Sequence, residues 1–127
     1  MYRDINIYKM SEIKVPDEIL KTINYYYDGV RNGDVDLAQK SMGLWATMTL
    51  HENGKINTVP IQAFYDWVRN SGPQESSYKI IGFIKNDKTA LINIQSHYGK
   101  GGDPITSFGL VKSDEGWKIV SKLVSDK

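Results

Sequence analysis

The stretch VPDEILKTINYYYDGVRNGD (residues 15–34) has the features of a complete amphipathic helix. Pro16 suits the first helical turn, because the N–H that proline lacks would be unpaired there anyway. Asp17 and Glu18 follow, and negative side chains are favoured at the positive end of the helix dipole. Gly33 can adopt the left-handed conformation that commonly ends a helix. The sequence therefore predicts one long helix that ends at Gly33.

The three consecutive tyrosines of this helix are predicted to divide between its two faces. At about 100° per residue, apolar side chains that recur three and four positions apart form one stripe. Tyr26 and Tyr27 flank that stripe, whereas Tyr25 points well away from it. We therefore expect two of the three phenols to lie in the interior. The stripe comprises Ile19, Ile23, Tyr26, Tyr27 and Val30.

A short helix and a hairpin follow the first helix. Asp34 is a typical N-cap residue, and it precedes a helical segment over residues 35–42. The segment LWATMTLHENGKINTV (residues 44–59) alternates in the manner of a strand before its turn. Its Asn53-Gly54 pair is a strong signal for a tight turn between two strands. The sequence therefore predicts a hairpin in the middle of the chain.

A third helix and four strands complete the chain. Pro60 opens a helical segment over residues 61–70. Short gaps rich in turn-forming residues separate the later segments, which favours antiparallel neighbours. The four predicted strands cover residues 78–85, 89–98, 105–112 and 117–124. We expect one α+β domain over residues 1–127, with the helices on one face of an antiparallel sheet. Residues 1–15 are either an N-terminal arm or an extension of the first element.

Composition excludes several classes of function. The net charge is +1, so no strong positive field attracts nucleic acid or an anionic membrane. Cysteine is absent, which removes disulfides, thiol nucleophiles and the commonest structural zinc sites. The two histidines lie in separate elements without a third ligand at metal-like spacing, so we expect no metal site. Without a signal peptide or an apolar run of membrane-spanning length, a cytoplasmic location is the default expectation.

Three segments carry a resemblance to a known superfamily. They are YYDGVRNGD (residues 26–34), NGKINTVPIQAFYDWV (residues 53–68) and LVKSDEGWKIVSK (residues 110–122). Their order and spacing resemble the nuclear transport factor 2-like superfamily, and within it the putative lumazine-binding group, relatives of the SnoaL-like proteins. The resemblance runs from about residue 16 to the end of the chain.

The resemblance implies a cone-shaped fold. In the superfamily, a curved antiparallel sheet wraps around an N-terminal helix, with three helices in all, and leaves a pocket at its open end. Members commonly form homodimers through the outer face of the sheet. The same fold serves enzymes, ligand-binding proteins and scaffolds, so the fold alone does not assign a function.

Tyr26 has two interpretations. Ketosteroid isomerases share the fold, and a tyrosine and a protonated aspartic acid form their oxyanion hole. Tyr26 lies eight residues before Asp34, which resembles the position of that tyrosine before a similar Gly-Asp pair. The resemblance implies that Tyr26 donates a hydrogen bond into the pocket. In the other interpretation Tyr26 packs between helix and sheet with its hydroxyl paired locally, as buried tyrosines usually do.

The positions that match the family's catalytic groups hold other residues. The position of the isomerase's carboxylate base falls near Leu50, which cannot accept a proton. The strand ITSFGL (residues 105–110) contains no acid. Lumazine-binding relatives often carry F-H-P-D-A after the second helix, where this chain has MGLWA with Gly43 and Trp45 in the histidine and aspartate positions. The sequence therefore favours an apolar binding pocket over the family's catalysis.

A polar row alternates with apolar residues in the predicted strand over residues 89–98. Asn93, Gln95 and His97 share one face, because strand side chains alternate with a period of two. If this face lines the cone, the row orients a polar ligand group, with His97 as an acid or base near neutral pH. If the face meets water, it is an ordinary polar surface or part of a dimer interface.

We expect a non-catalytic domain that binds a small apolar or aromatic molecule without a cofactor. The candidate pocket residues are Tyr26, Trp45, Phe64 and His97, because they lie on elements that surround the cone in relatives. The alternative is an isomerase-, dehydratase- or cyclase-like enzyme that uses Tyr26 with His97 or Asp66. That enzyme requires these side chains to converge within about 3–6 Å of one another, directly or through one water. A third alternative is a homodimeric scaffold for protein interactions.

Overall fold

A computed structural model describes residues 13–125, so most of the predicted arm over residues 1–15 lies outside the described residues. The helices are α2 (Asp17–Asn32), α3 (Val35–Gln39) and α4 (Gln62–Ser71). The strands are β1 (Met42–Glu52), β2 (Lys55–Pro60), β3 (Ser76–Lys85), β4 (Thr89–Tyr98), β5 (Ile105–Ser113) and β6 (Gly116–Ser125). The predicted α+β fold is confirmed. Pro60 ends β2 instead of opening α4, whose N-cap is Ile61.

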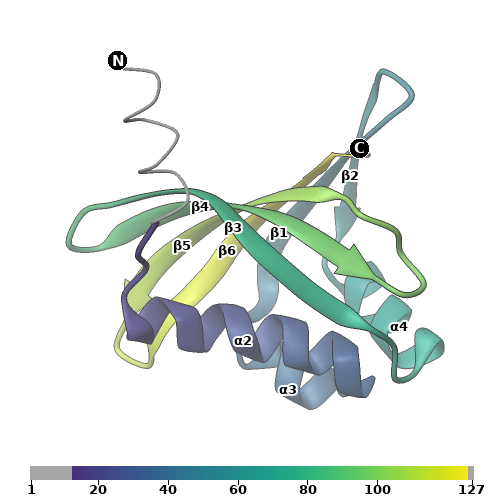
Figure 1. Ribbon diagram of the computed structural model, residues 1–127, viewed down its shortest axis with the longest axis horizontal. Helices are drawn as coiled ribbons and strands as arrows, with labels where there is room; N and C mark the ends of the chain where they lie inside the picture. The colour runs from purple at the N-terminus through teal and green to yellow at the C-terminus, as the bar shows by residue number, and fades with distance from the viewer. Residues whose placement is uncertain (1–12, 126–127) are drawn as a thin grey trace.

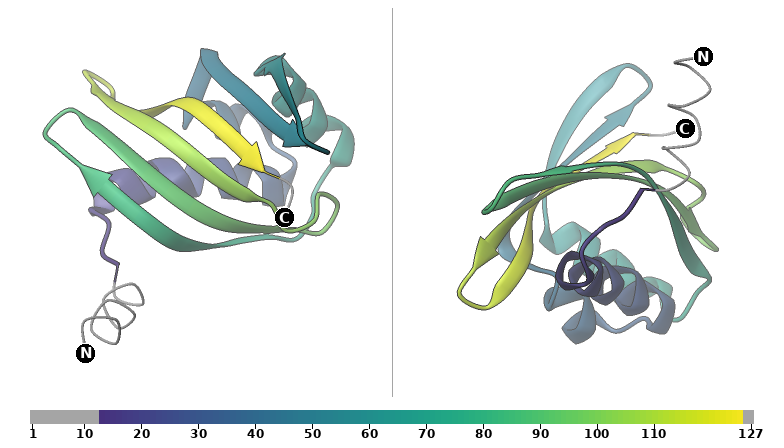
Figure 2. Two further views of the ribbon diagram at one scale, coloured as in Figure 1. Left: turned by 90° about the horizontal axis from the view of Figure 1, so that it is seen from above. Right: turned by 60° about the vertical axis from the view of Figure 1, so that its left-hand side comes forward.

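All six strands form one curved sheet in the order β2-β1-β6-β5-β4-β3. Figure 1 shows α2 and α3 along the concave side of this sheet, with α4 at one end. The second view in Figure 2 shows the sheet arching over α2. The predicted cone, a curved sheet around the first long helix, is therefore confirmed. None of the helices within residues 13–125 is both long and apolar enough to cross a membrane.

One strand pair differs from the predicted antiparallel arrangement. β1 and β6 run parallel, with Met48 opposite Lys122, whereas the other four strand pairs are antiparallel. Each antiparallel pair is joined by a short loop, which requires the chain to reverse direction. Helix α4 and four other strands lie between β1 and β6 along the chain, so no short loop fixes their relative direction.

Local sequence signals fix the ends of α2 and the turn of the hairpin. Gly33 caps α2 in the left-handed conformation with φ 63°, as predicted. The Asp34 side chain accepts a hydrogen bond from the Leu37 N–H and so caps α3. Asn53 and Gly54 both adopt positive φ between β1 and β2, as the predicted tight turn requires.

Gly29 lets α3 fold back closely onto α2. A Cβ atom at this position would lie 2.7 Å from both the backbone nitrogen and the Cβ of Ala38. This separation is shorter than any normal carbon contact, and the obstructing atoms include rigid backbone. Glycine inside a helix is unfavourable by about 1 kcal/mol relative to alanine. Here it permits a close approach of the two helices.

The three tyrosines divide as predicted. Tyr26 and Tyr27 are fully buried between α2 and the sheet, whereas Tyr25 is only partly buried. The Tyr26 ring stacks on Phe64 of α4 and meets Phe108 of β5 edge-on. These rings join the first helix, the last helix and the middle of the sheet in one aromatic core.

Candidate functional site

The main candidate site is a cleft of about 510 Å³ at the end of the cone where α4 lies below the β4–β5 loop (Figure 1). Its volume falls within the range of roughly 300–1,000 Å³ that is usual for small-molecule sites. Strands β1, β2, β4 and β6, helix α4 and the β4–β5 loop all contribute to the cleft. Its lining residues are Met48, Leu50, Glu52, Val59, Ala63, Phe64, Trp67, Tyr98, Gly101, Pro104, Lys122 and Val124.

Three aromatic side chains form one wall of this cleft. Phe64 and Trp67 come from α4, and their ring centroids are 5.9 Å apart. Trp67 meets Tyr98 of β4 edge-on at 5.3 Å. Trp67 is half-buried and faces the cleft. Aliphatic side chains of β1, β2 and β6 complete an apolar surface that suits a flat ligand.

Lys122 is the one charged side chain buried in the lining of this cleft. It is only 6% exposed, and its Nζ lies 3.9 Å from the centre of the Phe64 ring and 5.1 Å from that of Tyr26. Within residues 13–125, no carboxylate lies within ion-pair distance of this nitrogen and no side chain or carbonyl accepts a hydrogen bond from it. Burial lowers the pKa of Lys122 to about 7.

A β-bulge turns Lys122 into the interior. Gly109 and Leu110 of β5 pair with Ser121 and Ile119, so Val120 is an extra residue on β6. An extra residue reverses the alternation of side chains beyond it. Without the bulge, an inward Ile119 would place Lys122 on the outer face. Sequence analysis missed Lys122 because strict alternation from the inward Trp117 predicts the opposite face.

Tyr26 lies beneath the cleft and is absent from its lining. Its ring stacks on Phe64 with the centroids 4.8 Å apart. The Tyr98 hydroxyl donates a hydrogen bond to the Tyr26 hydroxyl at 3.1 Å. Burial raises the pKa of Tyr26 well above its usual value and also raises the pKa of Tyr98. Both phenols therefore stay neutral near pH 7, and the pair supports the floor under Phe64.

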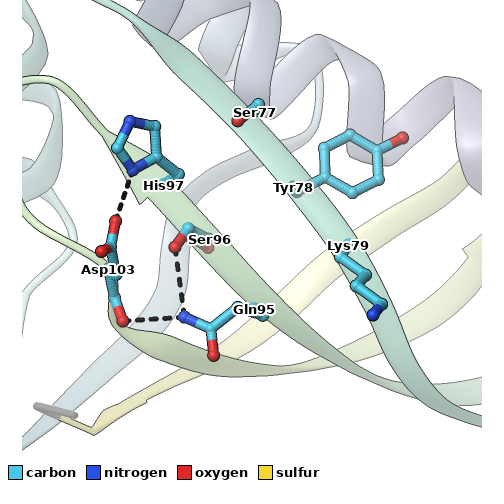
Figure 3. A pocket seen from close by; sticks show the side chains of 7 residues that line it. All are labelled: Ser77, Tyr78, Lys79, Gln95, Ser96, His97 and Asp103. Carbon is cyan, nitrogen blue, oxygen red and sulfur yellow. Dashed lines mark hydrogen bonds and ion pairs between the residues drawn. The ribbon is translucent and has the colours of Figure 1, made fainter.

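His97 lies on the convex face of the sheet, in a separate hollow of about 390 Å³ (Figure 3). The neighbouring Ile94 and Ser96 are fully buried, so the polar row of β4 faces away from the cone interior. The His97 imidazole bonds Asp103 at 2.5 Å through Nδ1 and Glu75 at 2.6 Å through Nε2. Hydrogen bonds to these two carboxylates raise the pKa of His97. The ring thus ties the β4–β5 loop to the start of β3.

Trp45 and Asp66 also lie away from the cleft. Trp45 is on the outer side of β1 and is 58% exposed, because the inward positions are taken by Ala46 and Met48. Asp66 is exposed on α4, where its carboxylate accepts hydrogen bonds from Gln62 and Arg69. Phe64 is the one predicted pocket residue that lines the cleft.

The structure does not bring Tyr26 together with His97 or Asp66, as the enzyme alternative requires. Tyr26 is buried against Tyr98, whereas His97 and Asp66 bind other partners on exposed surfaces. Among the described residues, no group of three metal-binding side chains is present. The cleft therefore presents a largely apolar lining with one buried amine, Lys122, and one exposed carboxylate, Glu52.

The comparison with protein families gives one match, to the family described as putative lumazine-binding, over residues 14–125. No curated protein matches the chain. Many solved structures do, including a nuclear transport factor 2-like protein of unknown function from Shewanella baltica. It is 22% identical, with a TM-score of 0.76 over 85% of this chain and 90% of the other.

Two further structures show the same fold. A nuclear transport factor 2-like protein of unknown function from Methylobacillus flagellatus is 22% identical, with a TM-score of 0.76 over 91% of this chain and 95% of the other. A domain of unknown function with a cystatin-like fold from Nostoc punctiforme is 15% identical, with a TM-score of 0.61 over 84% and 73%. The structures show that the chain has the fold of the nuclear transport factor 2-like proteins. Since the family match covers most of the chain, the protein belongs to the putative lumazine-binding family.

Proposed function

We propose that this protein is a non-catalytic domain that binds a small, flat, largely apolar molecule in the cleft at the open end of the cone. The observation that carries the proposal is the composition of the cleft, in which Phe64, Trp67 and Tyr98 form an aromatic wall. Ligand sites are typically apolar concavities with a few convergent polar groups. A cleft of 510 Å³ has room for a molecule of two or three fused rings.

The placement of the charged groups favours binding over catalysis. Glu52 and Lys122 both line the cleft, but no ion pair joins them. Lys122 pairs with Met48 in the parallel ladder, and Glu52 lies four residues further along β1. At about 3.3 Å per residue, the two side chains are attached roughly 13 Å apart. General acid–base catalysis needs an acid and a base within hydrogen-bond reach of the same reacting group, and among the described residues no ion pair brings Glu52 and Lys122 together.

Filling the cleft is expected to abolish ligand binding. Ala63 of α4 faces the cleft, so an Ala63→Phe substitution places a ring where the ligand would lie. Gln62→Phe adds the same ring to the same helix at an exposed position outside the lining and serves as the matched control. With 2-naphthamide as the probe, chemical-shift titration is expected to show binding at least about tenfold weaker in Ala63→Phe only, a change of about 1.4 kcal/mol.

The shifted amide resonances give a second readout of the same titration. In the native protein they are expected at β1, α4 and the end of β6, which surround the cleft. Shifts confined to the convex face, or equal binding by both variants, would contradict the proposed site.

We further infer that the convex face of the sheet joins two copies of the chain. Leu91 of β4 and Leu123 of β6 point outward there and are 60% and 54% exposed. Leu91 is paired with Gly109 of β5, and Leu123 is paired with Ser107 of the same strand. Because glycine and serine are small, the surface between the two leucines is recessed. An exposed apolar patch favours association, and a two-fold dimer covers the same patch on both copies.

The dimer is tested by sedimentation analysis of the native protein and of a Leu123→Glu variant. We expect a concentration-dependent dimer for the native protein and a monomer for the variant, because two carboxylates would face each other across the interface. Lys112→Glu, at an exposed position near the β5–β6 turn, is the control for added negative charge. If the native protein remains monomeric at all concentrations, the proposed dimer is wrong, and the convex face is then available to a different partner chain.

A further inference from the structure

The unusual feature of the cleft is a buried cation without a counter-charge. Lys122 as a residue is more than nine-tenths buried and lines the cleft, and its Nζ lies over the rings of Phe64 and Tyr26. The negative faces of aromatic rings attract a desolvated cation. A buried ammonium without an anionic partner nevertheless loses its hydration, which two rings do not replace. The site therefore lacks one negative charge.

We propose that Lys122 is a subsite for an anionic group, so that the ligand of this cleft is a flat aromatic carboxylate or a molecule with an equivalent single negative charge. This inference rests on the proposed binding function of the cleft. The acidic group lies against the Lys122 Nζ at the inner end, and the ring system lies along Phe64 and Trp67. An ammonium–carboxylate hydrogen bond is about twice as strong as one between neutral groups.

The other titratable groups that face this subsite do not supply the missing charge. From α2 and β4, Tyr26 and Tyr98 contribute phenols whose raised pKa values keep them neutral near pH 7. From β1, Glu52 is exposed at the end of the strand and forms no ion pair with Lys122. Asp103, in the nearby loop, is already paired with His97 on the convex face. An anion at the inner end therefore has no competitor among the described residues.

Glu52 adds a second element of specificity. Glu52 is exposed at the end of β1 and lines the cleft, so a second negative charge on the ligand close to it would be repelled. The cleft thus discriminates by charge at both ends. A monoanion with an apolar, neutral or hydrogen-bond-donating outer end fits this arrangement, and a dicarboxylate does not.

The test compares 2-naphthoate with 2-naphthamide, which have the same ring and differ in charge, by calorimetry at pH 6.5 and pH 9.5. At pH 6.5 the native protein is expected to bind the carboxylate at least about tenfold more tightly than the amide, a difference of about 1.4 kcal/mol. This preference shrinks at pH 9.5, because Lys122 then binds no proton in the free protein. Binding of the carboxylate at pH 8 is accompanied by proton uptake from the buffer.

Two variants separate this subsite from general electrostatic attraction. Lys122→Met is expected to lose the preference for carboxylate and to keep binding of the amide. Lys118→Met is the matched control on the same strand, because the Lys118 Nζ donates to the Lys40 carbonyl at the surface. The pH series of the native protein gives the same information if Lys122→Met does not fold.

Each outcome decides between the two proposals. Equal affinity of the native protein for naphthoate and naphthamide would overturn the anionic subsite and leave the apolar binding function standing. A carboxylate preference that survives in Lys122→Met would likewise overturn the role of Lys122. If neither compound binds in the cleft, both the anionic subsite and the proposed binding function are wrong.

Discussion

The free energy of unfolding of a Lys122→Met variant is expected to exceed that of the native protein most clearly at pH 7, and the excess is expected to shrink as the pH rises toward 10. The cause is the cost of holding an ammonium group in the apolar floor of the cleft. Methionine has a similar length and packs against the same rings without a charge. Replacement of an unpaired buried charge by an apolar side chain is therefore stabilising.

The direction of the pH dependence follows from proton linkage. Burial lowers the pKa of Lys122 from 10.5 to about 7 in the folded state. Between these two values the unfolded chain binds one more proton than the folded protein, so native stability rises with pH in this window. The slope is about 1.4 kcal/mol per pH unit, because one pKa unit corresponds to 1.36 kcal/mol. Below about pH 7 both states are protonated and the penalty becomes constant.

The free energy of unfolding of both proteins is measured with urea at pH 7, 8 and 9, and the value for the native protein is subtracted from that for the variant at each pH. Because Tyr26 and Tyr27 are present in both proteins, the effect of their titration cancels in this subtraction. Lys118→Met is the control and should give no pH-dependent difference, because that lysine pairs at the surface. If the Lys122→Met difference is the same at all three pH values, Lys122 is charged in the folded protein throughout, contrary to the expectation.

Tyr26→Ala is expected to destabilise the protein by about 3–5 kcal/mol, the range found when a buried aromatic residue is truncated. Tyr26 is fully buried and stacks on Phe64, and its hydroxyl accepts the hydrogen bond of Tyr98. Truncation leaves a cavity under the cleft and an unpaired hydroxyl on Tyr98. Since small domains are stable by about 5–15 kcal/mol, the variant loses a large part of its stability.

The neighbouring tyrosine provides a matched control. Tyr25 is only partly buried, and the Nζ atoms of Lys21 and Lys40 lie 5.9 Å and 5.6 Å from the centre of its ring. Tyr25→Ala removes the same atoms from the same helix, and it is expected to change the free energy of unfolding by no more than about 0.5 kcal/mol. Thermal and urea unfolding of the two variants measure the contrast. Similar losses in both would contradict the division of the tyrosines between the two faces.

Local features of the fold were predictable from sequence, because each depends on a few adjacent residues. Gly33 ends α2, Asp34 caps α3, and Asn53-Gly54 forms the hairpin turn, all as their backbone preferences require. The direction of β1 relative to β6 depends on the path of the intervening chain. Turn signals carry no information about such a distant pair, so the parallel pairing was not predicted.

The candidate site was less predictable than the fold, since it depends on which face and which end of the sheet each side chain occupies. Phe64 shares the buried face of α4 with Tyr65 and Val68, and helical spacing is enough to place it there, in the cleft wall. Trp45 and His97 were placed by analogy with the elements that surround the cone, and alternation puts both on the outer side. Lys122 reaches the cleft only because Val120 is bulged.

The parallel pairing of β1 with β6 has a consequence for synthesis on the ribosome. Met48 and Lys122 are partners in that ladder although 74 positions separate them along the chain. The hairpin of β1 and β2 leaves the ribosome early. The edge of β1 that pairs with β6 then has unpaired backbone groups until β6 has also left the exit tunnel. Contacts between such distant residues slow folding, and an unpaired strand flank invites association with other chains. Nascent chains truncated before residue 117 are therefore the form of this protein that most needs a chaperone.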